Sequence, residues 1–188
     1  MLHLLYALAL LLLLGGAAAL LAERFTLSPA LLPLPLLSGA VVVLYVFGIA
    51  GFLRAGAVVV LALAAVWVAA LVKRRPAGAV QAWQNAVTTP GFALFLGGAA
   101  FIWLLFFTQQ PMFTQWDEFT AWGLAPKMVV ERGAFYVADP VNLKASFTYP
   151  ATSLVTFLFQ PFGPWAEWAC LAAIDTLALA CLAAASAL

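Results

Sequence analysis

Long apolar runs dominate this sequence and limit what it can fold into. About 20 apolar residues in an α-helix cross the hydrocarbon core of a bilayer, which is roughly 30 Å thick. The runs cover Leu2–Leu21, Leu36–Val72, Gly91–Phe107 and Trp165–Leu188. The second run would form a helix of roughly 55 Å, so we expect two spans joined by a tight turn at Arg54. The runs therefore predict an all-α, polytopic membrane helix bundle with about five spans.

The composition supports this fold class and excludes several kinds of function. Of the 188 residues, 66% are apolar and 8% are charged, whereas soluble domains have about 45–50% and about 25%. The formal net charge is +1, so the chain has no basic surface for the phosphates of a nucleic acid. We therefore exclude a soluble enzyme, a disordered tail and a nucleic-acid binder, and we expect the lipid bilayer to be a partner.

The chain divides into two regions. Residues 1–90 hold three expected spans and a cytoplasmic loop, and residues 91–188 hold two spans separated by a polar loop at 108–164. Within this loop, the apolar run 151–162 is too short to cross a bilayer, so we expect it to lie in the interface or to re-enter the membrane. The last run ends at Leu188 without a polar flank, which predicts that the sequence is the front part of a longer protein.

Basic residues predict the orientation of a membrane protein, because they are enriched in cytoplasmic loops. With five spans, four basic residues fall on each side, so only their density separates the two sides. The consecutive basic residues Lys73-Arg74-Arg75 adjoin the third span, whereas those of the polar loop are spread out. We therefore expect the N-terminus and loop 108–164 to be extracytoplasmic.

The segment from Gln115 to Gly133 is the most informative part of the loop. Asp117 is a good N-cap, and Glu118 suits the first turn of a helix. Gly133 is typical of a helix stop, while Pro126 favours a kink or two short helices. The segment therefore predicts an amphipathic juxtamembrane helix with two carboxylates at its start.

These residues also have a purely structural interpretation. Asp117 would cap the helix and Glu118 would complement its dipole. Lys127 and Glu131 would form an exposed pair at i,i+4 spacing. In this interpretation the loop carries no chemistry.

The order of these motifs resembles the first extracytoplasmic loop of GT-C glycosyltransferases, most closely the protein-mannosyltransferase and aminoarabinose-transferase-like branch. In that branch an Asp-Glu pair follows a transmembrane helix, and a Tyr-Pro-Pro or Lys-Pro-Pro motif precedes a juxtamembrane helix. Here Asp117-Glu118 follows the fourth span and Tyr149-Pro150 precedes the short apolar run. The resemblance covers about residues 91–188. The chain departs from the pattern in having Ala151 instead of a second proline, and three spans rather than one before the loop.

The resemblance implies transfer of a sugar from a polyprenyl-phosphate donor to an acceptor lipid, glycan or protein on the extracytoplasmic side of a bacterial inner (plasma) membrane. It implies that Asp117 is the catalytic base, with Glu118 as a second catalytic candidate. The substrate-binding candidates are three cations for the leaving phosphate and one aromatic residue for the pocket: Lys127, Arg132, Lys144 and Tyr149. No cofactor is implied. A divalent metal on the two carboxylates is compatible with the superfamily, but no residue cluster has metal-ligand spacing.

Two other classes of function remain open. A transporter or flippase subunit for lipid-linked sugars would use the polar loop and Asp175, a carboxylate about ten residues into the last span. Transporters commonly show a repeat between halves and paired broken helices, and we find neither pattern in the sequence. A non-catalytic membrane scaffold would tolerate loss of the loop carboxylates.

Overall fold

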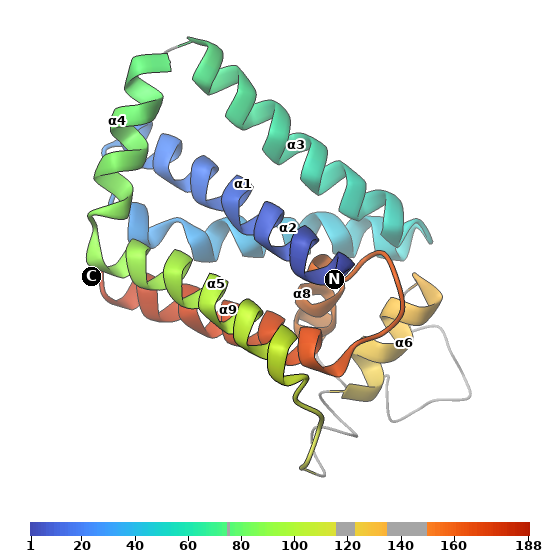
Figure 1. The fold of residues 1–188 in the computed structure, drawn as a ribbon. Helices are drawn as coiled ribbons and strands as arrows, with labels where there is room; N and C mark the ends of the chain where they lie inside the picture. Colours follow the sequence, from blue (N-terminus) through green and yellow to red (C-terminus); the bar gives the residue numbers. More distant parts are fainter. Residues whose placement is uncertain (75, 116–122, 135–149) are drawn as a thin grey trace.

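The computed structural model describes residues 1–74, 76–115, 123–134 and 150–188 (Figure 1). In these ranges the chain is helical and contains no strand. Five helices are long and apolar enough to cross a membrane, which confirms the expected all-α bundle with five spans and defines a multi-pass membrane protein. The helices of these spans are α1 (Leu2–Phe25), α2 (Pro33–Ile49, whose span also takes in the residues from Pro29), α3 (Leu53–Arg74), α5 (Pro90–Gln109) and α9 (Glu167–Ala185). The shorter described elements are η1 (Pro29–Leu31), α4 (Pro76–Val87), α6 (Ala125–Arg132) and α8 (Pro150–Phe159).

The long second apolar run folds into two spans, as expected, but the turn lies slightly earlier than predicted. Helix α2 ends at Ile49 and α3 begins at Leu53. Gly51 takes φ 81° between them, a left-handed conformation that glycine adopts without a steric cost. Arg54 therefore lies in the first turn of α3 instead of in the connection.

The spans pack through small residues and a few large buried aromatic side chains. Helices α5 and α9 run antiparallel and side by side (Figure 1). Between them the indole Nε1 of buried Trp103 donates a hydrogen bond to Oγ1 of Thr176 at 3.0 Å. A Cβ on Gly98 would lie 3.2 Å from Cδ1 of Leu179, so α5 approaches α9 closely at that glycine. Such close approach of backbones at small residues is typical of helix packing in membranes.

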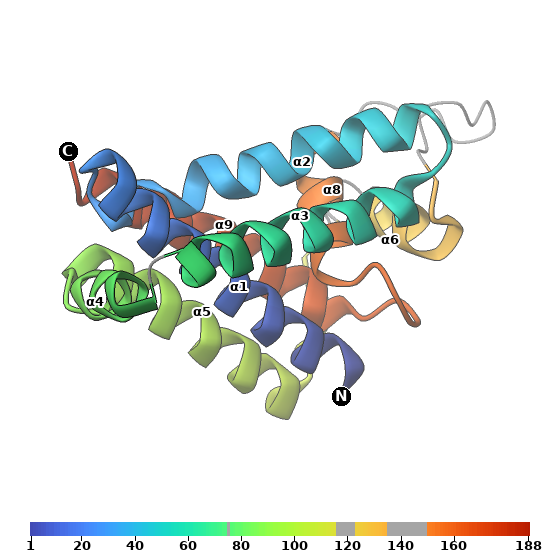
Figure 2. The ribbon, with the colours of Figure 1, turned by 90° about the horizontal axis from the view of Figure 1, so that it is seen from above.

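The connections gather at two opposite ends of the bundle (Figures 1 and 2). One end, which we call the loop end, holds the N-terminus, the α2–α3 turn, the end of α5, α6, α8 and the start of α9. The other end, which we call the α4 end, holds the α1–α2 connection, α4 and the C-terminal residue. Lys73 lies toward the α4 end, so the N-terminus and the described parts of loop 108–164 lie opposite it, as the expected order of five spans requires. Which end faces the cytoplasm stays a prediction.

The short apolar helix α8 is buried at the loop end. Its side chains from Ser153 through Phe159 are all buried, because α2, α6 and α9 pack around it. A helix resting on a bilayer surface would keep one polar face in water. Helix α8 therefore does not have the one-sided burial of an interfacial helix.

Candidate functional site

Helix α6 forms one wall of the loop end and presents its charged side chains outward. Met128, Val129 and Val130 are buried in the contact between α6 and α8, whereas Lys127 and Glu131 are exposed. This separation confirms the amphipathic pattern of the second half of the expected helix. The apolar face fixes α6 to the bundle, so that its polar face is available to water or to a ligand.

The pair predicted at i,i+4 spacing on α6 is present. Lys127 Nζ lies 3.9 Å from Glu131 Oε1, and both side chains are about half exposed. An exposed pair of this kind contributes only about 0.3–0.5 kcal/mol. Arg132, the second predicted cation, is exposed in the last turn of the same helix. Two of the predicted phosphate-binding residues thus share one short helix.

The end of α6 confirms Gly133 as the helix stop. It also lies beside a third cation, Arg54, which the sequence analysis treated only as part of a turn. Gly133 has φ 62°, and its N–H donates a hydrogen bond to Val129 O at 2.9 Å. Arg54 reaches across from the first turn of α3, so that a Cβ on Gly133 would lie 2.7 Å from its Nε. A cation at the carboxyl end of a helix faces the negative end of the helix dipole. The signal in the sequence is that Arg54 is the one charge inside a long apolar run.

The segment that leaves α5 is fixed to the start of α9. The N–H of Phe113 donates a hydrogen bond to Oε2 of Glu167 at 3.0 Å. The ring of Phe113 also packs against that of Trp165, with centroids 6.3 Å apart. Sequence reasoning assigned no role to Glu167, although it belongs to the Gly-Pro-Trp-Ala-Glu-Trp sequence in which the last span begins. Phe113 lies four residues before Asp117 in the sequence, so this contact anchors the chain just before the predicted catalytic pair.

The N-terminus of the chain is held beneath the turn that precedes α9. His3 Nε2 donates a hydrogen bond to the carbonyl oxygen of Pro164 at 2.8 Å. Gly163 has φ 101°, and a Cβ there would lie 3.1 Å from Cε1 of His3. The imidazole also meets Trp168 edge to face, with centroids 6.2 Å apart. This environment gives His3 a packing role between α1 and the turn.

Helix α8 carries a polar stripe that the apolar composition of its run conceals. Ser153 and Thr156 of α8 and Gln160 directly after it fall at i, i+3 and i+7 on one face, and all three are fully buried. Thr156 Oγ1 lies 3.6 Å from Cys170 Sγ of α9, and Oε1 of Gln160 accepts a hydrogen bond from the N–H of Ala166 at 3.1 Å. Ser153 Oγ and Gln160 Nε2 have no hydrogen-bond partner among the described residues. Native proteins pair most such atoms with protein, water or ligand, so the polar stripe indicates a polar interior at the loop end.

An aromatic cluster joins α5, α8 and α9. Trp103 of α5 lies with its ring centroid 5.3 Å from that of Phe159 of α8 and 5.8 Å from that of Trp168 of α9. Phe107 of α5 meets Trp168 edge to face at 5.7 Å. Rings packed in this way hold the helices that carry the polar residues in a fixed relative position.

The remaining predicted site residues lie outside the described part of the chain. These are Asp117, Glu118, Lys144 and Tyr149. The residues that the structure does describe contain no group of three or more His, Cys, Asp or Glu side chains that could hold a metal ion. The described site therefore consists of cations on α6 and α3, the polar stripe of α8, and the Glu167 anchor.

Comparison with known proteins assigns this multi-pass membrane protein to no family. No family model matches the chain, and neither a curated protein nor a solved structure is significantly similar to it.

Proposed function

We propose that the chain belongs to a membrane-embedded glycosyltransferase that takes a sugar from a polyprenyl-phosphate donor and acts at the loop end. The sequence supports this through the order of the Asp117-Glu118 pair, Tyr149-Pro150 and the helix that follows. The observation that carries the proposal is that both flanks of the Asp117-Glu118 segment are anchored at this end. Glu167 holds Phe113 on one flank, and burial against α8 holds α6 on the other.

The cations of the loop end suit a phosphate leaving group. Arg54, Lys127 and Arg132 are all exposed on this side of the bundle. Arginine offers paired donors to phosphate oxygens, and lysine offers a point charge. A polyprenyl chain would stay in the surrounding lipid, while its sugar and phosphate reach the membrane surface where these side chains lie.

The reaction that fits these groups is one inverting displacement. Asp117 takes the proton from an acceptor hydroxyl or amine as its oxygen or nitrogen bonds to the anomeric carbon of the sugar. The bond between that carbon and the phosphate oxygen breaks, and polyprenyl phosphate leaves with the electron pair. General-base assistance of this kind contributes about 10²–10⁴-fold to a rate.

The test compares the purified full-length protein with its Asp117→Asn variant on a polyprenyl-phosphate sugar. We expect the variant to lose about 10²–10⁴-fold in turnover. The matched control is Glu23→Gln, which neutralises an exposed carboxylate at the end of α1 toward the α4 end and is expected to keep the wild-type rate. Equal turnover of wild type and Asp117→Asn would remove Asp117 from the mechanism.

The same purified protein distinguishes a transferase from the other two classes of function. A flippase would move the donor lipid across a vesicle membrane without cleaving the sugar–phosphate bond, and a scaffold would do neither. Asp175, the residue on which a transport path would depend, is partly buried near the middle of α9. Transporter sites are typically built from paired interrupted helices. Four of the five spans are single helices, and the second joins the short turn η1 to α2.

A further inference from the structure

One carboxylate lies deep inside a membrane span. Asp175 follows the start of α9 at Glu167 by about 12 Å of helix rise and precedes its end at Ala185 by about 15 Å. The other charged residues of the five spans all lie within the first or last turn of their helix. An ionisable side chain at this depth is costly, and such residues almost always face the interior of a bundle or pair with another polar group.

Asp175 does neither within the bundle. Its side chain is partly exposed, and it has no hydrogen bond or ion pair with any residue that the structure describes. The neighbouring side chain of Thr176 is fully buried instead, and its Oγ1 accepts the hydrogen bond from Trp103 of α5. Asp175 therefore lies beside the polar contact between α5 and α9 without taking part in it.

The carboxylate belongs to a face of α9 that no other described helix covers. Ala178, Leu182 and Ala185 follow Asp175 at i+3, i+7 and i+10, which places them on one side of the helix, and all three are exposed. We call this side the outer face of α9. The opposite side packs against α5, α8 and α2, and α9 lies on the side of the bundle away from α3 (Figures 1 and 2). In a bilayer the outer face meets lipid or another protein.

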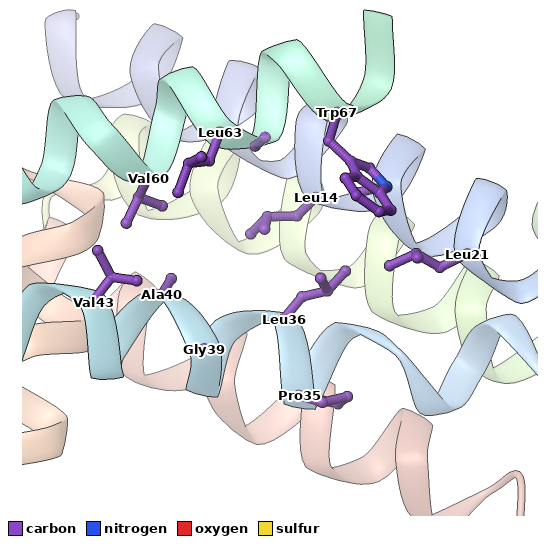
Figure 3. Close-up of a pocket in the computed structure, with 12 residues that line it drawn as sticks. Leu14, Leu21, Pro35, Leu36, Gly39, Ala40, Val43, Val60, Leu63 and Trp67 are labelled. Carbon is purple, nitrogen blue, oxygen red and sulfur yellow. The ribbon is translucent and has the colours of Figure 1, made fainter. Parts of the chain in front are cut away.

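The apolar groove between the first three spans shows how the outer face of α9 differs from an ordinary lipid-facing surface. The groove has a volume of about 540 Å³, and Figure 3 shows side chains of α1, α2 and α3 turned toward it. Its lining residues are all uncharged, and only the indole of Trp67 carries a side-chain polar atom. Lipid tails are as apolar as these walls, so the hydrocarbon of the bilayer suffices to cover them. The carboxylate of Asp175 needs a polar partner instead.

We propose that the outer face of α9 is a docking surface for a transmembrane helix of another protein, which presents a lysine or arginine to Asp175. Ionisable residues within membranes commonly pair with one another, because an oppositely charged pair carries no net charge into the hydrocarbon. The small side chains of Ala178 and Ala185 let the backbone of the partner helix come close. The proposal concerns the middle of the membrane and does not depend on the transferase site.

A second copy of this chain does not offer the required partner. In its five described spans no basic residue lies away from the helix ends, so no lysine or arginine of a second copy reaches the depth of Asp175. Two copies joined through the outer face of α9 would place one carboxyl group against another. The charge of Asp175 therefore favours a different protein as the partner.

The test measures association between the full-length protein and synthetic transmembrane peptides in bilayers. The peptides are leucine-rich helices of about 20 residues, and they carry either lysine or leucine at the central position. A fluorophore on the peptide and an acceptor dye at the N-terminus of the protein report binding by energy transfer. We expect the lysine peptide to bind at least about fivefold more tightly than the leucine peptide, which is the lower end of what a polar contact between membrane helices contributes in model peptides.

Three variants locate the binding. Asp175→Leu removes the carboxylate and should bind the lysine peptide no more tightly than the leucine peptide. Its folding should be undisturbed, because Asp175 has no polar partner among the described residues. Ala178→Leu adds bulk on the outer face of α9 and should weaken binding of the lysine peptide. The matched control is Ala64→Leu, which adds the same bulk in the groove between the first three spans and should leave that binding unchanged.

Three results would overturn the proposal. One is equal binding of the two peptides by the wild-type protein. Another is undiminished binding of the lysine peptide by Asp175→Leu. The third is energy transfer between differently labelled copies of the protein that Asp175→Leu abolishes, because the outer face of α9 would then be covered by a second copy.

Discussion

The N–H of Phe113 donates a hydrogen bond to Oε2 of Glu167 across 3.0 Å, and this joins the segment after α5 to the first turn of α9. The contact links residues 54 positions apart in the sequence. Because the acceptor is a carboxylate at the start of a helix, it also faces the positive end of the α9 dipole. A single side chain thus stabilises a helix start and orients the chain that leads to Asp117.

Removing the Glu167 carboxylate is expected to destabilise the loop end. A hydrogen bond to a charged group contributes about 1.5–3 kcal/mol, so Glu167→Ala should lower the free energy of unfolding by that amount. Glu167→Gln keeps an acceptor oxygen and should lose less than half as much. The measurement is reversible unfolding in detergent micelles, followed by circular dichroism.

The control for this prediction is Glu131→Ala. Its carboxylate lies in an exposed pair with Lys127, so its removal should change the free energy of unfolding by about 0.5 kcal/mol or less. If Glu167→Ala and Glu131→Ala prove equally mild, the Phe113 contact is not an anchor. Under the proposed function, Glu167→Ala should also slow sugar transfer more than Glu167→Gln does.

The spans were predictable because membrane helices must satisfy their backbone hydrogen bonds within the segment, which makes length and apolarity sufficient signals. Glycine placed one boundary as well, since Gly133 was predicted as a helix stop and ends α6 in a left-handed conformation. The turn between α2 and α3 was predicted at Arg54 because that residue is charged, but Gly51 supplies the required positive φ.

The arrangement of the loop end was not predictable from the sequence. His3 meets Pro164 across 161 positions of sequence, and Arg54 meets Gly133 only because the start of α3 lies near the end of α6. Such contacts depend on tertiary packing and leave no local pattern. The polar stripe of α8 was missed for a different reason, since Ser153 and Gln160 are diluted among large apolar neighbours and their shared face appears only once the helix is built.

Gly133→Ala is expected to destabilise α6 through its backbone. A non-glycine residue in the left-handed conformation costs about 1–2 kcal/mol, and the added methyl group would also displace the guanidinium of Arg54. In an Arg54→Ala background, Gly133→Ala should lower the free energy of unfolding by less than it does in the wild type. The difference should equal the contribution of a cation at a helix end, about 0.3–1 kcal/mol. A double-mutant cycle on the free energy of unfolding measures this difference. Strict additivity would show that Arg54 does not act on the end of α6.

The relative placement of the two ends of the bundle predicts a labelling pattern. Glu131 is exposed on α6 at the loop end, and Gln84 is exposed on α4 at the other end. In a background with Cys181→Ala, which removes the exposed native thiol, cysteines at these positions should react from opposite sides of the membrane. With the orientation expected from Lys73-Arg74-Arg75, a membrane-impermeant maleimide added to intact cells labels Glu131→Cys and reaches Gln84→Cys only after lysis. The reverse pattern would invert the orientation, and reaction of both from one side would contradict the fold.

Ser153 on α8 offers a contrast between stability and function. Its hydroxyl is fully buried and has no partner among the described residues, and such an atom costs about 1–3 kcal/mol of desolvation. Ser153→Ala is therefore expected to raise the free energy of unfolding by about 1 kcal/mol. Gln160→Leu leaves the Ala166 N–H without its acceptor, which costs about 1–3 kcal/mol, but it also removes the unpaired Nε2, so the net loss should be smaller than that cost.

If the unpaired hydroxyl of Ser153 serves a bound substrate, the stabilised Ser153→Ala variant should show a raised KM for the donor lipid. This is the usual cost when a functional group that is unfavourable for folding is removed. The measurement is KM together with the unfolding free energy on the same preparation, with Gln160→Leu as the comparison. A Ser153→Ala variant that is destabilised would mean that the hydroxyl has a structural partner. A Ser153→Ala variant that is stabilised and has an unchanged KM would show that the polar interior of the loop end serves packing only. A group in contact with the donor lipid cannot be removed without weakening the binding of that lipid.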